Sequence, residues 1–236
     1  MRTATVFDLD DTLVDSGAAW GRACGSVTAR HGHRWGPADD AVLHGNGDWP
    51  AFVAALCGDG ISAAEAMEEC TAAMAVECAA GRVPALPGAR GLVTAAERHG
   101  PVAVATASPR RYVHAILEEL GLAARMSAIV CAEDVVRGKP APDAYLRAAA
   151  VIGIPPSECM AVEDSANGIR SAVGAGMRVL AIPRAGSALP ADVAGLPAAQ
   201  ARDATSASPL LSRLLVSRSE PAHLRPAGPL AYEGTP

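Results

Sequence analysis

Several features that would identify large classes of protein are missing from this chain of 236 residues. It has no apolar run approaching the roughly 20 residues that a membrane-spanning helix needs. No basic run is interleaved with aromatic residues and the net charge is −5, so we expect no nucleic-acid partner and no membrane partner. The amino terminus enters an acidic segment within its first eight residues, which leaves no room for a signal peptide. Together these absences predict a soluble, cytoplasmic protein.

The sequence also lacks the usual signatures of several kinds of site. Its six cysteines form no Cys-x-x-Cys pair, and His31 and His33 have no companion at zinc-site spacing, so we interpret the cysteines as small core residues. There is neither a Gly-x-Ser-x-Gly elbow nor a Gly-x-x-x-x-Gly-Lys-Ser/Thr loop, which leaves acyl transfer and P-loop chemistry unsupported. Lysine is nearly absent: Lys139 alone among 20 basic residues carries a compact ammonium rather than a planar guanidinium.

Half of the residues are hydrophobic, which is enough for one sizeable core and a smaller appendage. Short apolar segments alternate with helical patterns along most of the chain. The predicted strands span residues 3–7, 101–106, 128–131, 159–162 and 178–182. This alternation predicts an α/β fold, a doubly wound (Rossmann-like) parallel sheet with right-handed crossovers, built from residues 1–14 plus 85–200.

The segment between the first two strands has only helical patterns. Helices are predicted at residues 18–30, from Pro37, and from the capping box Ser62-Ala63-Ala64-Glu65 to about residue 80. We therefore predict that residues 15–84 form an all-helical cap domain inserted after the first strand. Residues 201–236 are rich in Pro and Ser, and we expect a largely disordered tail with at most a short helix at 210–216.

Asp8, Asp10 and Asp11 follow directly after the first predicted strand. In open α/β sheets the carboxyl ends of the strands are where ligands bind. Carboxylates this close repel one another unless a cation lies between them or one carries a proton, and oxygen ligands of this kind suit Mg²⁺. An acidic turn that merely caps the next helix is the alternative for this segment alone.

Three further polar segments each follow an apolar strand: Thr106-Ala107-Ser108, Gly138-Lys139-Pro140 and Glu163-Asp164. Converging at one crevice, they would supply the acids, the cation and the hydroxyl that phosphoryl transfer requires. Taken singly, each has an ordinary explanation, as a strand residue, a surface turn or a helix-capping pair. Their occurrence in order argues against coincidence.

These segments resemble the four motifs of the haloacid dehalogenase-like superfamily. The resemblance lies in Asp8-Leu9-Asp10-Asp11-Thr12-Leu13, in Thr106, in Gly138-Lys139-Pro140-Ala141-Pro142-Asp143 and in Val162-Glu163-Asp164-Ser165-Ala166-Asn167-Gly168. The subgroup that the chain resembles has a helical cap and contains β-phosphoglucomutase-like proteins and sugar-phosphate phosphatases. The match extends over residues 4–183.

The resemblance implies a role for each motif residue. Asp8 would be the nucleophile that forms an aspartyl-phosphate, and Asp10 would protonate the leaving oxygen and then activate water. The phosphate oxygens would be held by Thr106, the Ala107 amide and Lys139. Mg²⁺ would be held by Asp8, the Asp10 backbone carbonyl and Asp164, with Glu163 acting through water.

The resemblance implies a phosphatase acting on a small phosphorylated metabolite of the sugar or polyol phosphate class. Asp10 disfavours dehalogenation, which needs no acid. A phosphomutase is the first alternative, although Asp48 stands where we align the mutases' phosphate-binding Arg. A catalytically silent metabolite-binding or regulatory protein is the second, although no motif acid is missing. We expect a monomer or weak homodimer.

The cap loop from His44 to Trp49 is expected to face the active site when the cap closes. His44, Asn46, Asp48 and Trp49 are the predicted substrate contacts, through hydrogen bonds and stacking on a sugar or polyol. Packing of Trp49 into the cap's own core is the alternative for that residue.

Overall fold

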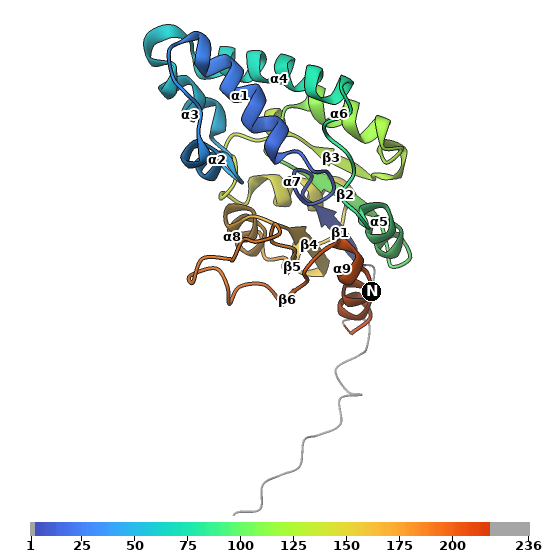
Figure 1. Ribbon diagram of the computed structural model, residues 1–236. Coiled ribbons are helices and arrows are strands. Elements are labelled where there is room, and N and C mark those ends of the chain that lie inside the picture. The colour runs from blue at the N-terminus through green and yellow to red at the C-terminus, as the bar shows by residue number, and fades with distance from the viewer. Residues whose placement is uncertain (1–2, 218–236) are drawn as a thin grey trace, which may run out of the picture.

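The computed structural model describes residues 3–217, and its centre is a parallel sheet. The strands are β1 (Ala4–Phe7), β2 (Val102–Ala105), β3 (Ala128–Val130), β4 (Cys159–Glu163), β5 (Arg178–Ala181) and β6 (Ala199–Gln200). They lie in the order β3-β2-β1-β4-β5-β6, and every neighbouring pair is parallel. The order changes direction at β1, with helices on both faces (Figure 1). The predicted doubly wound α/β fold is confirmed.

The sheet separates two apolar cores, because alternate residues of a strand point to opposite faces. Phe7 packs with Leu92 of α5 (Ala89–Glu97) and with apolar residues of α6 (Arg110–Glu119). Its neighbour Val6 packs on the other face with Tyr145 of α7 (Asp143–Ile152) and Ile169 of α8 (Ala166–Gly174). Both faces of β1 are therefore covered, which explains why all four of its residues are apolar or small and buried.

The segment of residues 15–84, between β1 and α5, contains helices and no strand, as predicted. It contains α1 (Gly17–Arg30), α2 (Pro37–Leu43), α3 (Trp49–Leu56) and α4 (Ala63–Ala79). The Ser62 capping box begins α4, where the Ser62 hydroxyl accepts from the Glu65 N–H at 3.2 Å. Helix α3 was not predicted, because its Trp49-Pro50 start resembles a turn; proline is tolerated there in the first helical turn.

The helical segment packs against the loops at the carboxyl ends of the strands. The Gly47 N–H donates to the Lys139 carbonyl at 3.0 Å, and the Trp49 indole N–H donates to the Ala107 carbonyl at 3.2 Å. One apolar cluster continues from Phe7 of the sheet to Met74 of α4. The division at residues 15 and 84 therefore remains our interpretation, since packing is continuous across it.

Part of the predicted tail is ordered. Helix α9 (Ala204–Val216) begins with an Asp203 cap, and its Ala207, Leu211 and Leu215 are buried in the same core as α5. The expectation of disorder from residue 201 is therefore wrong for residues 201–217, because that apolar stripe covers the face of the sheet beside α5. Residues 218–236, also assigned to the tail, lie outside the described residues.

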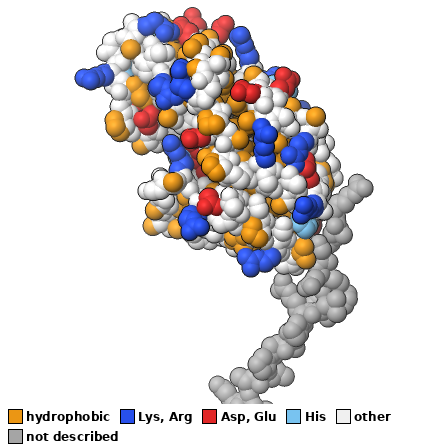
Figure 2. All heavy atoms as spheres, turned by 45° about the vertical axis from the view of Figure 1, so that its right-hand side comes forward, with side chains coloured by type: hydrophobic (Ala, Val, Ile, Leu, Met, Phe, Trp, Pro, Cys, Tyr) orange, Lys and Arg blue, Asp and Glu red, His pale blue; other side chains and the backbone are white. Residues whose placement is uncertain are grey.

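The surface carries both signs of charge. On the face shown in Figure 2, acidic and basic side chains are interspersed among apolar ones. Among the described residues, Arg125 pairs with Glu97 at 2.5 Å and Arg110 with Asp134 at 2.6 Å. Within residues 3–217, none of the helices combines the length and apolar content that crossing a bilayer would require.

Candidate active site

Lys139 lies at the centre of a buried charge cluster beneath the cap. Its Nζ is 2.6 Å from Asp8 Oδ1 at the end of β1 and 2.6 Å from Glu163 Oε1 at the end of β4. The lysine side chain is only 3% exposed, and its ammonium lies 5.0 Å from the ring centroid of Tyr145. Burial alone would lower the pKa of Lys139, but the carboxylates of Asp8 and Glu163 raise it, so the ammonium stays charged.

Glu163 is held by donors on both of its carboxylate oxygens. Besides Lys139, Oε1 accepts from the Tyr145 hydroxyl at 3.0 Å. Oε2 accepts from the N–H groups of Asp164 and Ser165, each at 3.0 Å, at the amino terminus of α8. A Cβ on Gly168 would lie 1.7 Å from this carboxylate, so only glycine fits there. Burial would raise the pKa of Glu163, but contact with Lys139 lowers it below its usual range.

The residues at this end fit a divalent cation. Asp8, Glu163 and Asp164 each offer a carboxylate oxygen, and these atoms lie within 4.8 Å of one another. Asp164 Oδ2 is buried and accepts no hydrogen bond. Burial raises the pKa of Asp8 to about 8 although Lys139 opposes the shift, and burial together with Glu163 raises that of Asp164. Ionising them together requires positive charge that one ammonium cannot supply, and oxygen donors suit Mg²⁺.

Asp10 lies on the other side of the cavity in a different environment. Its Oδ1 accepts from three donors: the Ser16 hydroxyl at 2.7 Å, the Trp20 indole N–H at 2.9 Å and the Tyr112 hydroxyl at 3.0 Å. Ser16 and Trp20 come from the beginning of the helical segment, whereas Tyr112 comes from α6. Burial and the neighbouring Asp10 raise the pKa of Tyr112 well above its usual range, so its hydroxyl keeps its proton.

The second oxygen of Asp10 faces the loop after β2. Oδ2 accepts from the Ser108 hydroxyl at 2.6 Å and, more distantly, from the Thr106 hydroxyl at 3.4 Å. The Thr106 hydroxyl in turn accepts from the Ser108 N–H at 3.1 Å. Sequence reasoning placed Ser108 in a motif segment without giving it a role. For Trp20 and Tyr112 it had no signal at all, because both occupy ordinary apolar positions of helices.

A third cluster joins Asp11, His44 and Arg184. Asp11 has a left-handed backbone (φ 58°), and its Oδ1 accepts from the N–H groups of Ser16 and Gly17 at the start of α1. Its Oδ2 lies 3.4 Å from Arg184 Nε and 3.7 Å from His44 Nδ1. Burial opposes ionisation of Asp11, but His44 and Arg184 lower its pKa. Arg184 follows β5, and its place at a strand end was the signal that sequence reasoning missed.

These clusters surround a cavity of about 230 Å³. Most of the predicted site residues line it together: Asp8, Asp10, His44, Asn46, Trp49, Thr106, Ala107, Lys139 and Asp164. Glu163 lies behind Lys139 rather than on the wall. Asp48 is exposed at the start of α3 and does not line this cavity, but it lines an adjoining hollow with Thr106 and Lys139, so its contact with substrate stays a prediction.

Trp49 satisfies both interpretations that the sequence left open. It is 5% exposed, and its ring lies 5.2 Å from that of Trp20, so it packs within the cap. It also lines the cavity and bonds to the Ala107 carbonyl of the core. The cavity therefore offers a carboxyl oxygen of Asp8 beside an ammonium, a separate carboxyl group of Asp10 held by neutral donors, and cap side chains that close it. Such an arrangement can attack, bind and protonate a small phosphate ester.

Comparison with known proteins agrees with this geometry. A model of the haloacid dehalogenase-like hydrolase family matches residues 3–176. Hexitol phosphatase A of Escherichia coli (strain K12) is 37% identical over 180 residues, which cover 75% of this chain and 81% of that protein. Validoxylamine A 7'-phosphate phosphatase of Streptomyces hygroscopicus subsp. limoneus is 32% identical over 181 residues, covering 75% and 84%.

Solved structures show the same fold. CbbY from Rhodobacter sphaeroides, in complex with phosphate, superposes with a TM-score of 0.74 at 25% identity and covers 87% of this chain and 96% of its own. β-Phosphoglucomutase from Clostridium difficile gives a TM-score of 0.78 at 16% identity, covering 93% and 99%, which speaks for the fold alone. The chain therefore belongs to the haloacid dehalogenase-like hydrolase family, within which it is a phosphoric monoester hydrolase.

Proposed function

We propose that this protein hydrolyses the phosphate monoester of a small sugar or polyol through an aspartyl-phosphate on Asp8, with Mg²⁺ as cofactor. The observation that carries the proposal is the position of Lys139 Nζ, 2.6 Å from both Asp8 and Glu163 in a roofed cavity. An ammonium fixed there neutralises phosphate oxygens beside a carboxylate placed to attack phosphorus.

Each step has a residue in position. An oxygen of Asp8 attacks phosphorus while the ester bond breaks, and Asp10 gives a proton to the departing alkoxide. Asp10 then takes a proton from water, which attacks the aspartyl-phosphate and releases phosphate from Asp8. Lys139, the Thr106 hydroxyl and the Ala107 N–H hold the phosphate oxygens. Asp8, Asp164 and the Asp10 backbone carbonyl would hold Mg²⁺, whose charge lets an anion approach an anion.

We assign Glu163 to Lys139 rather than to direct contact with the metal. Its two oxygens already accept from Lys139, Tyr145, and the backbone and hydroxyl groups at the start of α8. The Glu163 carboxylate therefore fixes the Lys139 ammonium in place. It also adds negative charge close to the Mg²⁺ that we propose between Asp8 and Asp164.

Cavity size and charge support a small, singly phosphorylated substrate. A cavity of about 230 Å³ is moderately larger than the roughly 150 Å³ that accommodates benzene, which suits a few-carbon polyol better than a nucleotide. Asp11, Asp40 and Asp164 line it, and Arg184 is paired with Asp11. A second phosphate would meet these carboxylates, so hydrolysis is favoured over mutase chemistry. The hexitol phosphatase relative points to the same substrate class.

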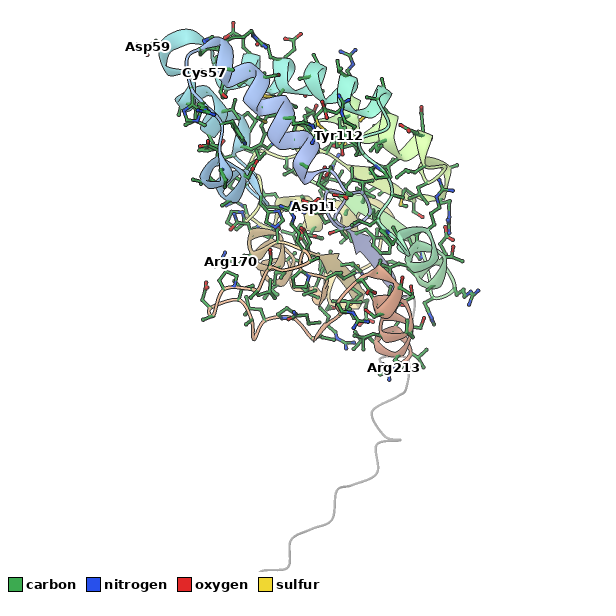
Figure 3. The ribbon with its side chains drawn as sticks, viewed as in Figure 1. Asp11, Cys57, Asp59, Tyr112, Arg170 and Arg213 are labelled. Atoms are coloured by element: carbon green, nitrogen blue, oxygen red, sulfur yellow. The ribbon has the colours of Figure 1, made fainter. Side chains whose placement is uncertain are left out.

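The test is phosphate release from a panel of sugar and polyol monophosphates, with Mg²⁺ and with a chelator. Asp8→Asn should abolish turnover of every substrate while leaving the thermal midpoint within a few degrees of wild type. Asp59→Asn is the matched control, because Asp59 is exposed at the far tip of the cap (Figure 3). Undiminished turnover in Asp8→Asn would exclude the mechanism. Dependence on a bisphosphate activator, with little net phosphate release, would indicate a mutase.

Binding of Mg²⁺ and a metabolite without phosphate release across the panel would instead indicate the regulatory alternative. A cytoplasmic location and a monomeric or weakly dimeric state remain predictions. Fractionation of cells and sedimentation of the purified chain would measure them.

A further inference from the structure

Two buried aromatic residues from different parts of the fold meet at one carboxylate oxygen. Trp20 comes from α1 and Tyr112 from α6, and their ring centroids lie 5.2 Å apart in an edge-to-face arrangement at 77°. Trp20 Nε1 is 2.9 Å and the Tyr112 hydroxyl 3.0 Å from Asp10 Oδ1. Figure 3 shows Tyr112 beside α1, between the cap helices and the sheet.

Packing by itself does not explain these polar contacts. Both residues are almost fully buried, at 7% and 4% exposure, and phenylalanine would supply a similar apolar ring. Buried indole N–H and phenol O–H groups need acceptors, yet both groups use the same oxygen of the residue proposed as the acid and base. The Ser16 hydroxyl binds that oxygen as well, so Oδ1 is surrounded.

The donors distinguish the two oxygens of Asp10. An indole N–H can only donate, so Oδ1 beside Trp20 must remain an acceptor. Oδ2 contacts the hydroxyls of Ser108 and Thr106, which can either donate or accept. Both of these residues line the cavity, whereas of the two aromatic donors to Oδ1 only Trp20 does and Tyr112 does not. Oδ1 already has three donors, whereas Oδ2 meets only two hydroxyls of the cavity wall, so Oδ2 is the oxygen placed to exchange a proton with a bound ester.

We propose that Trp20 and Tyr112 are positioning residues that clamp Asp10 Oδ1, so that Oδ2 faces the leaving oxygen of the substrate. This inference rests on the proposed phosphatase function. Tyr112 does not line the cavity and acts only through Asp10, whereas Trp20 acts through Asp10 and also lines the cavity.

The clamp also spans the joint between cap and core. Trp20 precedes the cap loop in the chain, and its ring packs against Trp49, which bonds to the Ala107 carbonyl of the core. Tyr112 belongs to the α6 helix of the core. Asp10 therefore has its full set of donors when the cap lies closed, as it does in this structure.

The leaving group provides the test. An alkoxide needs a proton as it departs, whereas p-nitrophenolate is a stable anion that needs little help. Tyr112→Phe keeps the ring and removes the hydroxyl, so kcat should fall roughly tenfold or more on glycerol phosphate or a hexitol phosphate and less than about threefold on p-nitrophenyl phosphate. Trp20→Phe should likewise lower kcat more on the alkyl phosphate than on p-nitrophenyl phosphate. It provides a second test if Tyr112→Phe folds poorly.

Two comparisons keep the result specific. Tyr145→Phe removes a phenol from the Lys139 side of the site, so it should lower turnover of both substrates by the same factor. In an Asp10→Ala background, Tyr112→Phe should cause no further loss on alkyl phosphates, because the two changes act through one group. Equal losses of Tyr112→Phe on both substrates, or an undiminished loss in the Asp10→Ala background, would overturn the clamp.

Failure of the clamp is distinguishable from failure of the phosphatase proposal. If wild-type enzyme releases phosphate and Asp8→Asn does not, the chemistry stands whatever Tyr112→Phe does. If the wild-type protein releases no phosphate, the proposed function is contradicted, and the clamp, which rests on it, is contradicted as well.

Discussion

The two sides of the cavity hold their carboxylates by opposite means. On one side, Asp8 and Glu163 share the single ammonium of Lys139, and all three side chains are buried. On the other side, Asp10 is held by neutral hydroxyl and indole donors and by no cation within hydrogen-bond reach among the described residues. Asp8 and Glu163 are therefore held by ion pairs with one ammonium. Asp10 is held by hydrogen bonds from uncharged side chains.

This difference suits the proposed roles. A buried ion cluster attracts an anion and holds it rigidly, and removing its single ammonium leaves two carboxylates uncompensated in a low dielectric. Neutral donors can fix a carboxylate while hydroxyls rotate to give or accept hydrogen bonds as a proton moves. The contacts of Lys139 with Asp8 and Glu163 come from the core, through β1, β4 and the loop at Lys139, and the cap reaches this side through His44, whose Nε2 lies 3.4 Å from Asp164 Oδ2. The neutral side takes Ser16 and Trp20, two direct donors to Asp10, from the cap. Electrostatic binding of the phosphate therefore depends mainly on groups at the carboxyl ends of the strands. Proton transfer by Asp10 depends on closure of the cap.

The largest effect should follow from removing the ammonium. Lys139→Met leaves Asp8 and Glu163 buried without their cation, so we expect the free energy of unfolding to fall by about 3–5 kcal/mol and phosphate release to fall at least roughly a thousandfold on alkyl and aryl esters alike. Urea unfolding and kinetics on both esters measure these changes. Arg137→Met is the control in the same loop, because Arg137 is 69% exposed and pairs only with Asp143 at the surface. A loss confined to alkyl phosphates would contradict the division between the two sides.

A smaller effect should follow from blocking closure. A Cβ on Gly47 would lie 2.3 Å from the backbone N and O of Lys139, so Gly47→Ala must push the cap loop away from the core. Because the neutral side depends on the cap, alkyl phosphate turnover should fall several-fold more than aryl phosphate turnover. Steady-state kinetics on both esters measure it.

Gly91→Ala is the matched control for this change. Gly91 is an exposed position in α5 where a Cβ meets nothing within 4 Å, so activity should stay unchanged and stability should rise by about 0.5–1 kcal/mol. Equal kinetics for Gly47→Ala and Gly91→Ala would show that closure does not matter to proton transfer.

The smallest effect concerns charge pairing in the cap, where the buried carboxylate of Glu77 meets two half-exposed arginines that solvent screens. Glu77 bonds with Arg82 and Arg22, and these contacts lower its pKa to about 2. Its contribution is therefore complete above the unfolded pKa near 4.5 and is lost as pH falls toward 2. Since both arginines are about half-exposed, Glu77→Gln should cost only about 1 kcal/mol at pH 7, and the difference from wild type should shrink toward pH 3.

Urea titrations at several pH values measure this difference. Glu69→Gln is the control, because Glu69 and Arg30 form a single exposed pair that should contribute almost nothing. A difference for Glu77→Gln that grew as pH fell would have the wrong sign for a carboxylate ionised in the folded state.

The sequence predicted the strands well because their signal is local. Each is a short apolar run with both faces covered, and Val6 and Phe7 have this character whatever surrounds them. Strand β6 has two residues and α3 begins with Trp49-Pro50, so neither produced a local signal. Only residues 210–216 of α9 were predicted as helix, because Pro209 and a composition that resembles disorder hid its first half, and its burial against α5 decides its structure.

Among the site residues, the motif acids, Thr106 and Lys139 could be found from sequence because chemistry restricts each to one or two residue types beside a strand end. Asp48 was predicted to contact substrate and lies in an adjoining hollow rather than on the cavity wall, whereas Arg184 was overlooked and lines the cavity. Loop conformation decides both cases, and a loop's path depends on contacts from distant segments such as Gly47 with Lys139.

What the sequence determined by itself, then, is the set of parallel strands and the identity of the groups at their ends, because period and residue chemistry are properties of short segments. Only the tertiary structure decided which carboxylate pairs with the ammonium and which is enclosed by hydroxyls and aromatic rings. Asp8 and Asp10 are two residues apart in one motif, yet their partners come from positions up to 131 residues away for Asp8 and 102 for Asp10. Their environments differ because opposite sides of one strand end face different helices and loops, and no local pattern records that choice.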